Sequence, residues 1–181
     1  MQAQASGLQV SVHGHPNADT LLLWHPAAAT DPDGVAALAS RIATRSSVRV
    51  VVPVWTLHSA GRDLLRSVRY ARESSVHPPD NLSVVGYDAA GIAALSLALN
   101  QRRLGIGLTR VTCVDGGPDT LDPISGQPLP APSPAPVETA VDVVETDGDW
   151  ARATVAAWQG AGWAATLVPR SQFTWRVNPS Q

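Results

Sequence analysis

The 181 residues, 44% of them hydrophobic and 15% charged, have an ordinary globular composition, and we expect a single domain over 1–181 with a sizeable core. The formal net charge of −2 gives no electrostatic case for binding nucleic acid or an acidic membrane surface. All 13 basic residues are arginine, which excludes lysine Schiff-base chemistry, pyridoxal phosphate anchoring and a P-loop.

The first half of the chain alternates short apolar runs with segments of helical periodicity. Residues 8–13 alternate apolar and polar side chains, which is typical of a half-exposed antiparallel edge strand. The solidly apolar runs 20–24 and 48–54 indicate buried strands. Apolar residues at helical spacing predict helices over 35–42 and 63–72.

A tight strand, turn and helix follow at 82–100. The apolar run 82–85 predicts a buried strand that stops at Gly86, and the Ala- and Leu-rich run to Asn100 predicts a buried helix. The residues around the turn are small, so the side chain of Asp88 should stand alone at its crest. That point lies just outside the carboxyl end of the strand, where open α/β sheets place their chemistry.

The second half repeats the pattern around an interruption. Strands are predicted at 110–114, 140–144 and 163–168, with a helix over 150–158. Seven of the residues in the loop 115–137 are proline, so we expect a stiff tether without a core, which leaves the site open. Alternating strands and helices predict an α/β protein with a mostly parallel sheet and helices on both faces.

The turn Gly86-Tyr87-Asp88-Ala89-Ala90, followed by Gly91, resembles the G-x-S-x-G nucleophile elbow of the α/β-hydrolases. The run LLLWHP, which ends at Pro26, looks like the strand and His-Gly motif that begins the oxyanion loop of that superfamily. The resemblance implies an α/β-hydrolase-like fold with a minimal or absent cap, similar to the small dienelactone-hydrolase-type members.

Two elbow positions depart from the family pattern, since Asp88 replaces the serine and Ala90 the second glycine. The family's catalytic histidine follows the last strand. All five histidines here precede residue 88, and 168–175 contains none. The standard Ser-His-acid triad has therefore lost two of its three members.

The resemblance implies an oxyanion pocket formed by the backbone N–H groups of Ala27 and Ala89. Asp88 would act there as a general acid or base, with His25 or His58 sharing the proton transfer. The residues expected to contribute to substrate binding are Tyr87, Trp24 and Trp55.

Each of these residues has other interpretations. Asp88 as a nucleophile would resemble haloalkane dehalogenases and epoxide hydrolases, which also need a histidine to release the ester. Asp88 as a helix cap is the structural alternative. His25 resembles a family position that braces the oxyanion loop, and His58 could simply face solvent.

We therefore expect a non-hydrolytic small-molecule enzyme: a lyase, isomerase, cyclase or acyl-handling catalyst. The alternative is an inactive hydrolase-like pseudoenzyme that serves as a binding module, and a weaker one is an esterase with a relocated His58. No cofactor and no metal site are expected, because the histidine spacing matches no zinc pattern. The expected partner is a small-molecule substrate or ligand, with no nucleic acid and no membrane, and a homodimer is left open. The single cysteine, Cys113, should be a buried, inert thiol, and a cytoplasmic location is expected.

Overall fold

The computed structural model describes residues 2–5, 7–26, 31–59, 61–77, 81–135 and 138–175. Within this part of the chain, eight strands form one sheet in the order β1-β2-β4-β3-β5-β6-β7-β8. The strands are β1 (Gln2–Ala5), β2 (Leu8–His13), β3 (Thr20–Trp24), β4 (Arg49–Pro53), β5 (Leu82–Tyr87), β6 (Leu108–Val114), β7 (Ala140–Val144) and β8 (Ala164–Val168). Strand β2 pairs antiparallel with β1 and β4, and every other pairing is parallel. The mostly parallel sheet is thereby confirmed.

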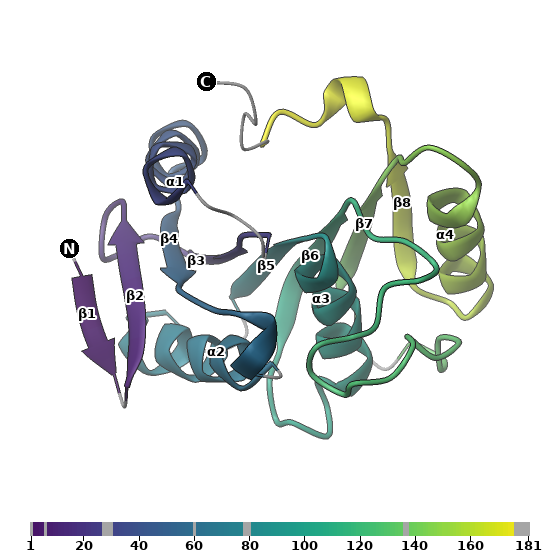
Figure 1. Ribbon diagram of the computed structural model, residues 1–181, viewed down its shortest axis with the longest axis horizontal. Coiled ribbons are helices and arrows are strands. Elements are labelled where there is room, and N and C mark those ends of the chain that lie inside the picture. The colour runs from purple at the N-terminus through teal and green to yellow at the C-terminus, as the bar shows by residue number, and fades with distance from the viewer. Residues whose placement is uncertain are drawn as a thin grey trace.

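Helices lie on both faces of this sheet, as expected. Figure 1 shows α1 on one side of the strands, with α2 and α3 on the other. The helices are α1 (Pro32–Ser46), α2 (Arg62–Ser74), α3 (Ala89–Asn100) and α4 (Trp150–Gly160), with short 3-10 turns at η1 (Leu57–Ser59) and η2 (Arg170–Gln172).

Strand β3 illustrates why the central strands are continuously apolar. Its side chains alternate between the two faces, so Leu21 and Leu23 join the core beneath α1 while Leu22 and Trp24 join the core beneath α2, α3 and α4. Because both faces are covered, all five residues of β3 are buried.

The face of the sheet shared with α1 becomes polar over β6, β7 and β8. Val111 and Val141 point into the core on the α3 and α4 side, so the neighbouring Arg110 and Asp142 point to the opposite face. There they form an ion pair across adjacent strands, and Thr166 on β8 is exposed on the same face. Polar residues at alternate positions suit a sheet face that no described helix covers.

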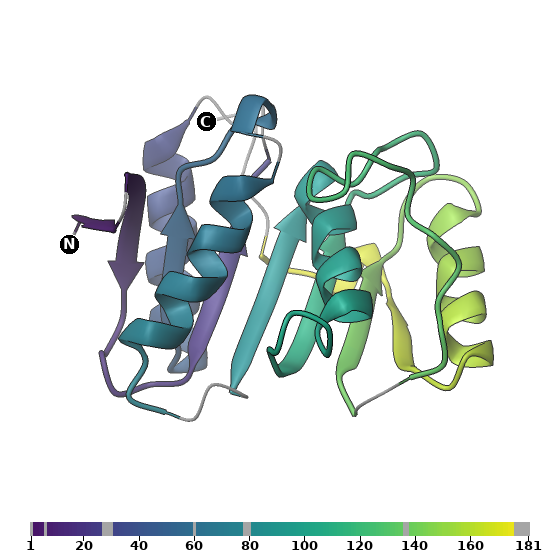
Figure 2. The ribbon, with the colours of Figure 1, turned by 90° about the horizontal axis from the view of Figure 1, so that it is seen from below.

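The proline-rich segment is better packed than the sequence indicated. Ile124 and Leu129 pack against the core that α3 and α4 share, and the indole N–H of Trp163 donates to the carbonyl of Ser133 at 2.8 Å. Asp122 is 1% exposed, and its carboxylate accepts backbone N–H groups two and three residues further on. Figure 2 shows this green segment running alongside α3 and α4. The expectation of a tether without a core was wrong, because apolar side chains between the prolines pack against the core of the domain.

Strand β1 was not anticipated from the sequence. It extends the sheet by pairing with β2, with Gln2 opposite Ser11 and Ala5 opposite Leu8.

None of the described helices has the length and apolarity that crossing a membrane would require.

Candidate functional site

The elbow forms where β5 ends and α3 begins. Asp88 lies between them with φ 55° and ψ −123°, a left-handed backbone conformation that is rare outside glycine. Its backbone N–H donates to the carbonyl of Val114 at 2.8 Å, and its own carbonyl accepts the N–H of Gly91 at 2.9 Å. These two hydrogen bonds hold the strained residue between β6 and the first turn of α3.

The turn is tight because two of its residues are glycines, which have no Cβ. A Cβ on Gly86 would lie 2.1 Å from the carbonyl oxygen of Ala90, and one on Gly91 would lie 2.9 Å from the sulfur of Cys113. The close approach of β5 and α3 therefore requires glycine at position 86. Ala90 itself is fully buried, so its methyl group fits where the family pattern has a second glycine.

The side chain of Asp88 is exposed and makes no capping hydrogen bond to α3. The helix-cap interpretation therefore lacks the interaction on which it depends. Although the side chain is exposed, the surrounding protein removes part of the water around its carboxyl, and this partial desolvation is the larger cause that raises the pKa above its usual value. The negative charge of nearby Asp115 raises this pKa further. The elbow thus presents a carboxyl that is not bonded to α3 and that takes up a proton more readily than an ordinary aspartate.

Asp115 is a residue that the sequence analysis missed. It follows β6 directly, as Asp88 follows β5, and it also has a positive φ of 56°. The two strands are parallel neighbours in which Tyr87 lies opposite Val114, so both carboxylates leave the sheet at the same edge. A signal was present, because a polar residue directly after a buried parallel strand is a site candidate.

The two candidate histidines have other surroundings in the structure. The ring nitrogen Nδ1 of His25 lies 2.7 Å from the carbonyl oxygen of Pro26, and its ring packs 6.2 Å from that of Trp55. His58 lies in η1 and is exposed. Among the described residues, no imidazole forms a hydrogen bond or ion pair with the Asp88 carboxylate.

The three candidate aromatic residues are largely buried. Trp24 is fully buried and its indole N–H donates to Ser67 at 2.9 Å. Trp55 is 2% exposed and donates to the carbonyl of His25 at 2.9 Å. Tyr87 is 3% exposed, belongs to the core beneath α1, and donates its hydroxyl to the carbonyl of Trp175. Each side chain therefore has a packing role, and each polar atom is already paired.

Only one of the two candidate oxyanion donors lies in the described part of the chain. Ala89 is the first residue of α3, so its backbone N–H has no acceptor within the helix and can serve an external oxygen. Ala27 belongs to 27–30, outside the described residues.

Cys113 lies directly beneath the elbow and is fully buried. Burial raises the pKa of its thiol to about 12, although the backbone N–H of Gly116 partly offsets this. At neutral pH the sulfur is therefore a protonated thiol that packs against the turn. Among the described residues, no three His, Cys, Asp or Glu side chains are grouped as metal ligands.

Two described cavities lie away from the elbow. The larger, of about 560 Å³, opens between α2 and α3, where Val68 and Leu97 are among its lining residues. The smaller, of about 360 Å³, lies between His13 and Ser40. Asp88 is not among the lining residues of either cavity.

Several solved esterase structures share this architecture. A structure described as an arylesterase aligns with a TM-score of 0.70 at 13% identity over 94% of this chain and 74% of its own. EstE5, in a crystal soaked with p-nitrophenyl butyrate, gives a TM-score of 0.71 at 13% identity, covering 93% of this chain and 74% of that one. An esterase of the bacterial hormone-sensitive lipase family gives 0.68 at 16% identity, with 97% and 75% covered. No protein-family model and no curated protein matches the sequence. The strand order and these likenesses together show that the chain has the α/β-hydrolase fold.

Proposed function

We propose that this protein is a non-hydrolytic small-molecule enzyme in which Asp88 acts as a general acid or base. The observation that carries the proposal is the carboxyl of Asp88 at the elbow, which is exposed and makes no capping hydrogen bond to α3. A capping aspartate would turn its oxygens back onto the N–H groups of α3. This carboxyl is left available to a substrate.

The electrostatic environment of Asp88, at the carboxyl ends of β5 and β6, supports proton transfer. The helix N-terminus stabilises the Asp88 anion and by itself would make a weak base. Partial burial and Asp115 act in the opposite direction and raise the pKa of Asp88, which brings it closer to the range where a carboxyl exchanges protons efficiently. The N–H of Ala89 would polarise a substrate carbonyl, with Ala27 as the second donor.

The reaction class follows from what the edge offers. A carbonyl held by backbone N–H groups beside a carboxylate base favours removal or addition of a proton at the carbon next to that carbonyl. Lyases, isomerases, cyclases and some acyl-handling catalysts use this chemistry. Such a step needs no covalent intermediate and therefore no histidine to release one.

A pseudoenzyme that binds a partner is the second candidate. It is supported by the location of the two described cavities, neither of which includes Asp88, and by the burial of Tyr87 and Trp24 in the core. An esterase would need an imidazole at Asp88. The exposed position of His58 lends that alternative no support.

Proton exchange tests the proposal directly. The protein is incubated in D₂O with a panel of small ketones, lactones and thioesters, and NMR follows deuterium entry beside the carbonyl. We expect exchange with at least one member of the panel, and we expect Asp88→Asn to abolish it. Asp119→Asn, at an exposed position of the proline-rich segment, is the matched control and should leave exchange unchanged.

The other outcomes separate the rivals. No exchange above the background rate across the whole panel would contradict the enzyme and favour the binding module. Turnover of a chromogenic short-chain ester that is lost in His58→Ala would instead support the relocated-histidine esterase.

A further inference from the structure

The cavity between α2 and α3 is not used by the proposed reaction. Its lining includes Leu97, near the end of α3, whereas the elbow lies at the start of that helix beside Ala89. At 1.5 Å per residue, these two positions are about 12 Å apart along the helix axis. The cavity therefore needs an explanation of its own.

The walls of this cavity are mainly apolar. Its volume of about 560 Å³ lies within the usual range for small-molecule sites. Leu104 in this lining is 41% exposed, so part of the apolar wall is accessible to solvent. The apolar lining residues are Leu65, Val68, Leu97, Leu104 and Ile106.

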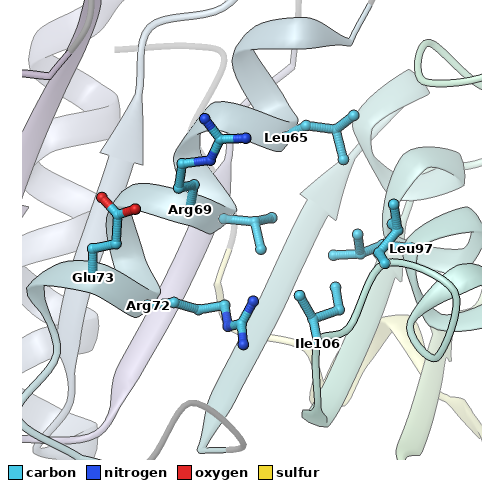
Figure 3. Close-up of a pocket in the computed structure, with 8 residues that line it drawn as sticks. Leu65, Arg69, Arg72, Glu73, Leu97 and Ile106 are labelled. Atoms are coloured by element: carbon cyan, nitrogen blue, oxygen red, sulfur yellow. The ribbon is translucent and has the colours of Figure 1, made fainter.

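Two arginines and one glutamate of α2, Arg69, Arg72 and Glu73, complete the lining. Arg69 and Arg72 lie three residues apart, on one side of the helix, and both border the cavity. Figure 3 shows Arg72 reaching from α2 toward Ile106, across from Leu97 on α3, while the carboxylate of Glu73 points away. In the described part of the chain, neither arginine forms an ion pair.

Arg72 also has an unsatisfied polar atom. Its Nε is buried and has no hydrogen-bond partner among the residues that the structure describes. A buried guanidinium N–H without an acceptor costs free energy. An anionic group in the cavity would supply this acceptor.

We propose that this cavity binds a small amphipathic carboxylate, with its hydrocarbon chain on the leucine and isoleucine side chains and its carboxylate on Arg72 and Arg69. A planar guanidinium matches a carboxylate through two parallel hydrogen bonds. The apolar walls favour a ligand whose surface is mostly hydrocarbon over a fully hydrated inorganic anion. Charge complementarity thus selects the head group, and the lining selects the tail.

Isothermal titration calorimetry with octanoate and octanol tests the proposal, since the two probes share a chain length and differ in the charged head. We expect octanoate to bind at one site, with octanol at least about tenfold weaker. Arg72→Gln should weaken octanoate binding by about tenfold or more, and Arg69→Gln, at an exposed position, should weaken it in the same direction. Arg66→Gln is the matched control, because Arg66 lies on the same helix outside the cavity and pairs with Asp63 at 3.5 Å.

Leu104→Gln provides a second variant that leaves the buried core intact. It should weaken octanoate and octanol alike, since it removes apolar surface and no charge. No octanoate binding, equal affinity for octanol, or full affinity in both arginine variants would each overturn the proposal. Binding of a glutamate-rich peptide in place of octanoate would identify a peptide-docking groove and would overturn it as well.

Discussion

The backbone N–H of Asp88 donates a 2.8 Å hydrogen bond to the carbonyl of Val114. This bond extends the ladder between β5 and β6 by one residue beyond the last paired strand positions, Tyr87 and Val114. The apex of the elbow is therefore held by the neighbouring strand β6 as well as by its own turn, in which the Asp88 carbonyl accepts the N–H of Gly91. The same bond places Asp88 beside Asp115, the residue that follows Val114.

The elbow predicts a steric requirement at Gly86. In Gly86→Ala the new Cβ would lie 2.1 Å from the backbone oxygen of Ala90, which a flexible side chain cannot relieve. We expect the free energy of unfolding to fall by about 1–3 kcal/mol, measured by urea denaturation. Gly160→Ala is the control, because a Cβ at that position would meet nothing within 4 Å. Equal stability of the two variants would contradict the close packing of β5 on α3.

The raised pKa of Asp88 predicts a pH-dependent stability. The folded protein holds this proton more tightly than the unfolded chain does. The resulting stabilisation is fully present below the unfolded pKa and is lost as pH rises through the folded pKa. Asp88→Asn removes this dependence, so the variant should gain stability relative to wild type between about pH 3 and pH 7. Urea denaturation at both pH values measures the difference in free energy of unfolding between the variant and wild type. The same difference at both pH values would contradict a raised pKa of Asp88.

The neighbouring carboxylate predicts a further effect on the same group. Asp115→Asn removes the negative charge that helps to raise the pKa of Asp88, so this pKa should fall toward its ordinary value without reaching it. The remainder is due to burial, the larger cause. NMR titration of the side-chain carboxyl carbon of Asp88 in both proteins gives the two pKa values. A higher pKa in the variant would mean that Asp115 acts on Asp88 through some other interaction.

Cys113 should resist thiol reagents in the folded protein. Its pKa of about 12 leaves almost no thiolate at pH 8, and the sulfur is fully buried. We expect a slow reaction with DTNB under native conditions. In about 8 M urea, which unfolds most small domains, the reaction should be rapid and stoichiometric. Rapid labelling of the native protein would show that the core beneath the elbow opens readily.

Ser67 supports the indole of Trp24 inside the core. Both residues are fully buried, and Ser67→Ala leaves the indole N–H without its acceptor at 2.9 Å. We expect the free energy of unfolding to fall by about 1–3 kcal/mol. Urea denaturation monitored by tryptophan fluorescence measures this change. Ser40→Ala on the exposed side of α1 is the control and should cost much less. Similar losses in the two variants would show that the Trp24 hydrogen bond adds little.

The sequence by itself determined the layered fold and the position of the elbow. The apolar run 20–24 matches β3 at both ends because a strand buried on both faces leaves an unbroken hydrophobic signature. The small residues around Asp88 marked the turn because β5 and α3 approach too closely for larger ones. The role of Asp88 in chemistry stays a prediction.

Only the tertiary structure decided how distant residues meet. Nothing local in the proline-rich segment indicated that Ile124 would pack into the core, and no pattern paired Asp115 with Asp88 or opened a cavity between α2 and α3. Periodicity and turn chemistry act over a few residues and are written in the sequence. Distances across the sheet depend on strand order, which places β5 beside β6. The packing of the helices likewise leaves the buried Nε of Arg72 without an acceptor among the described residues.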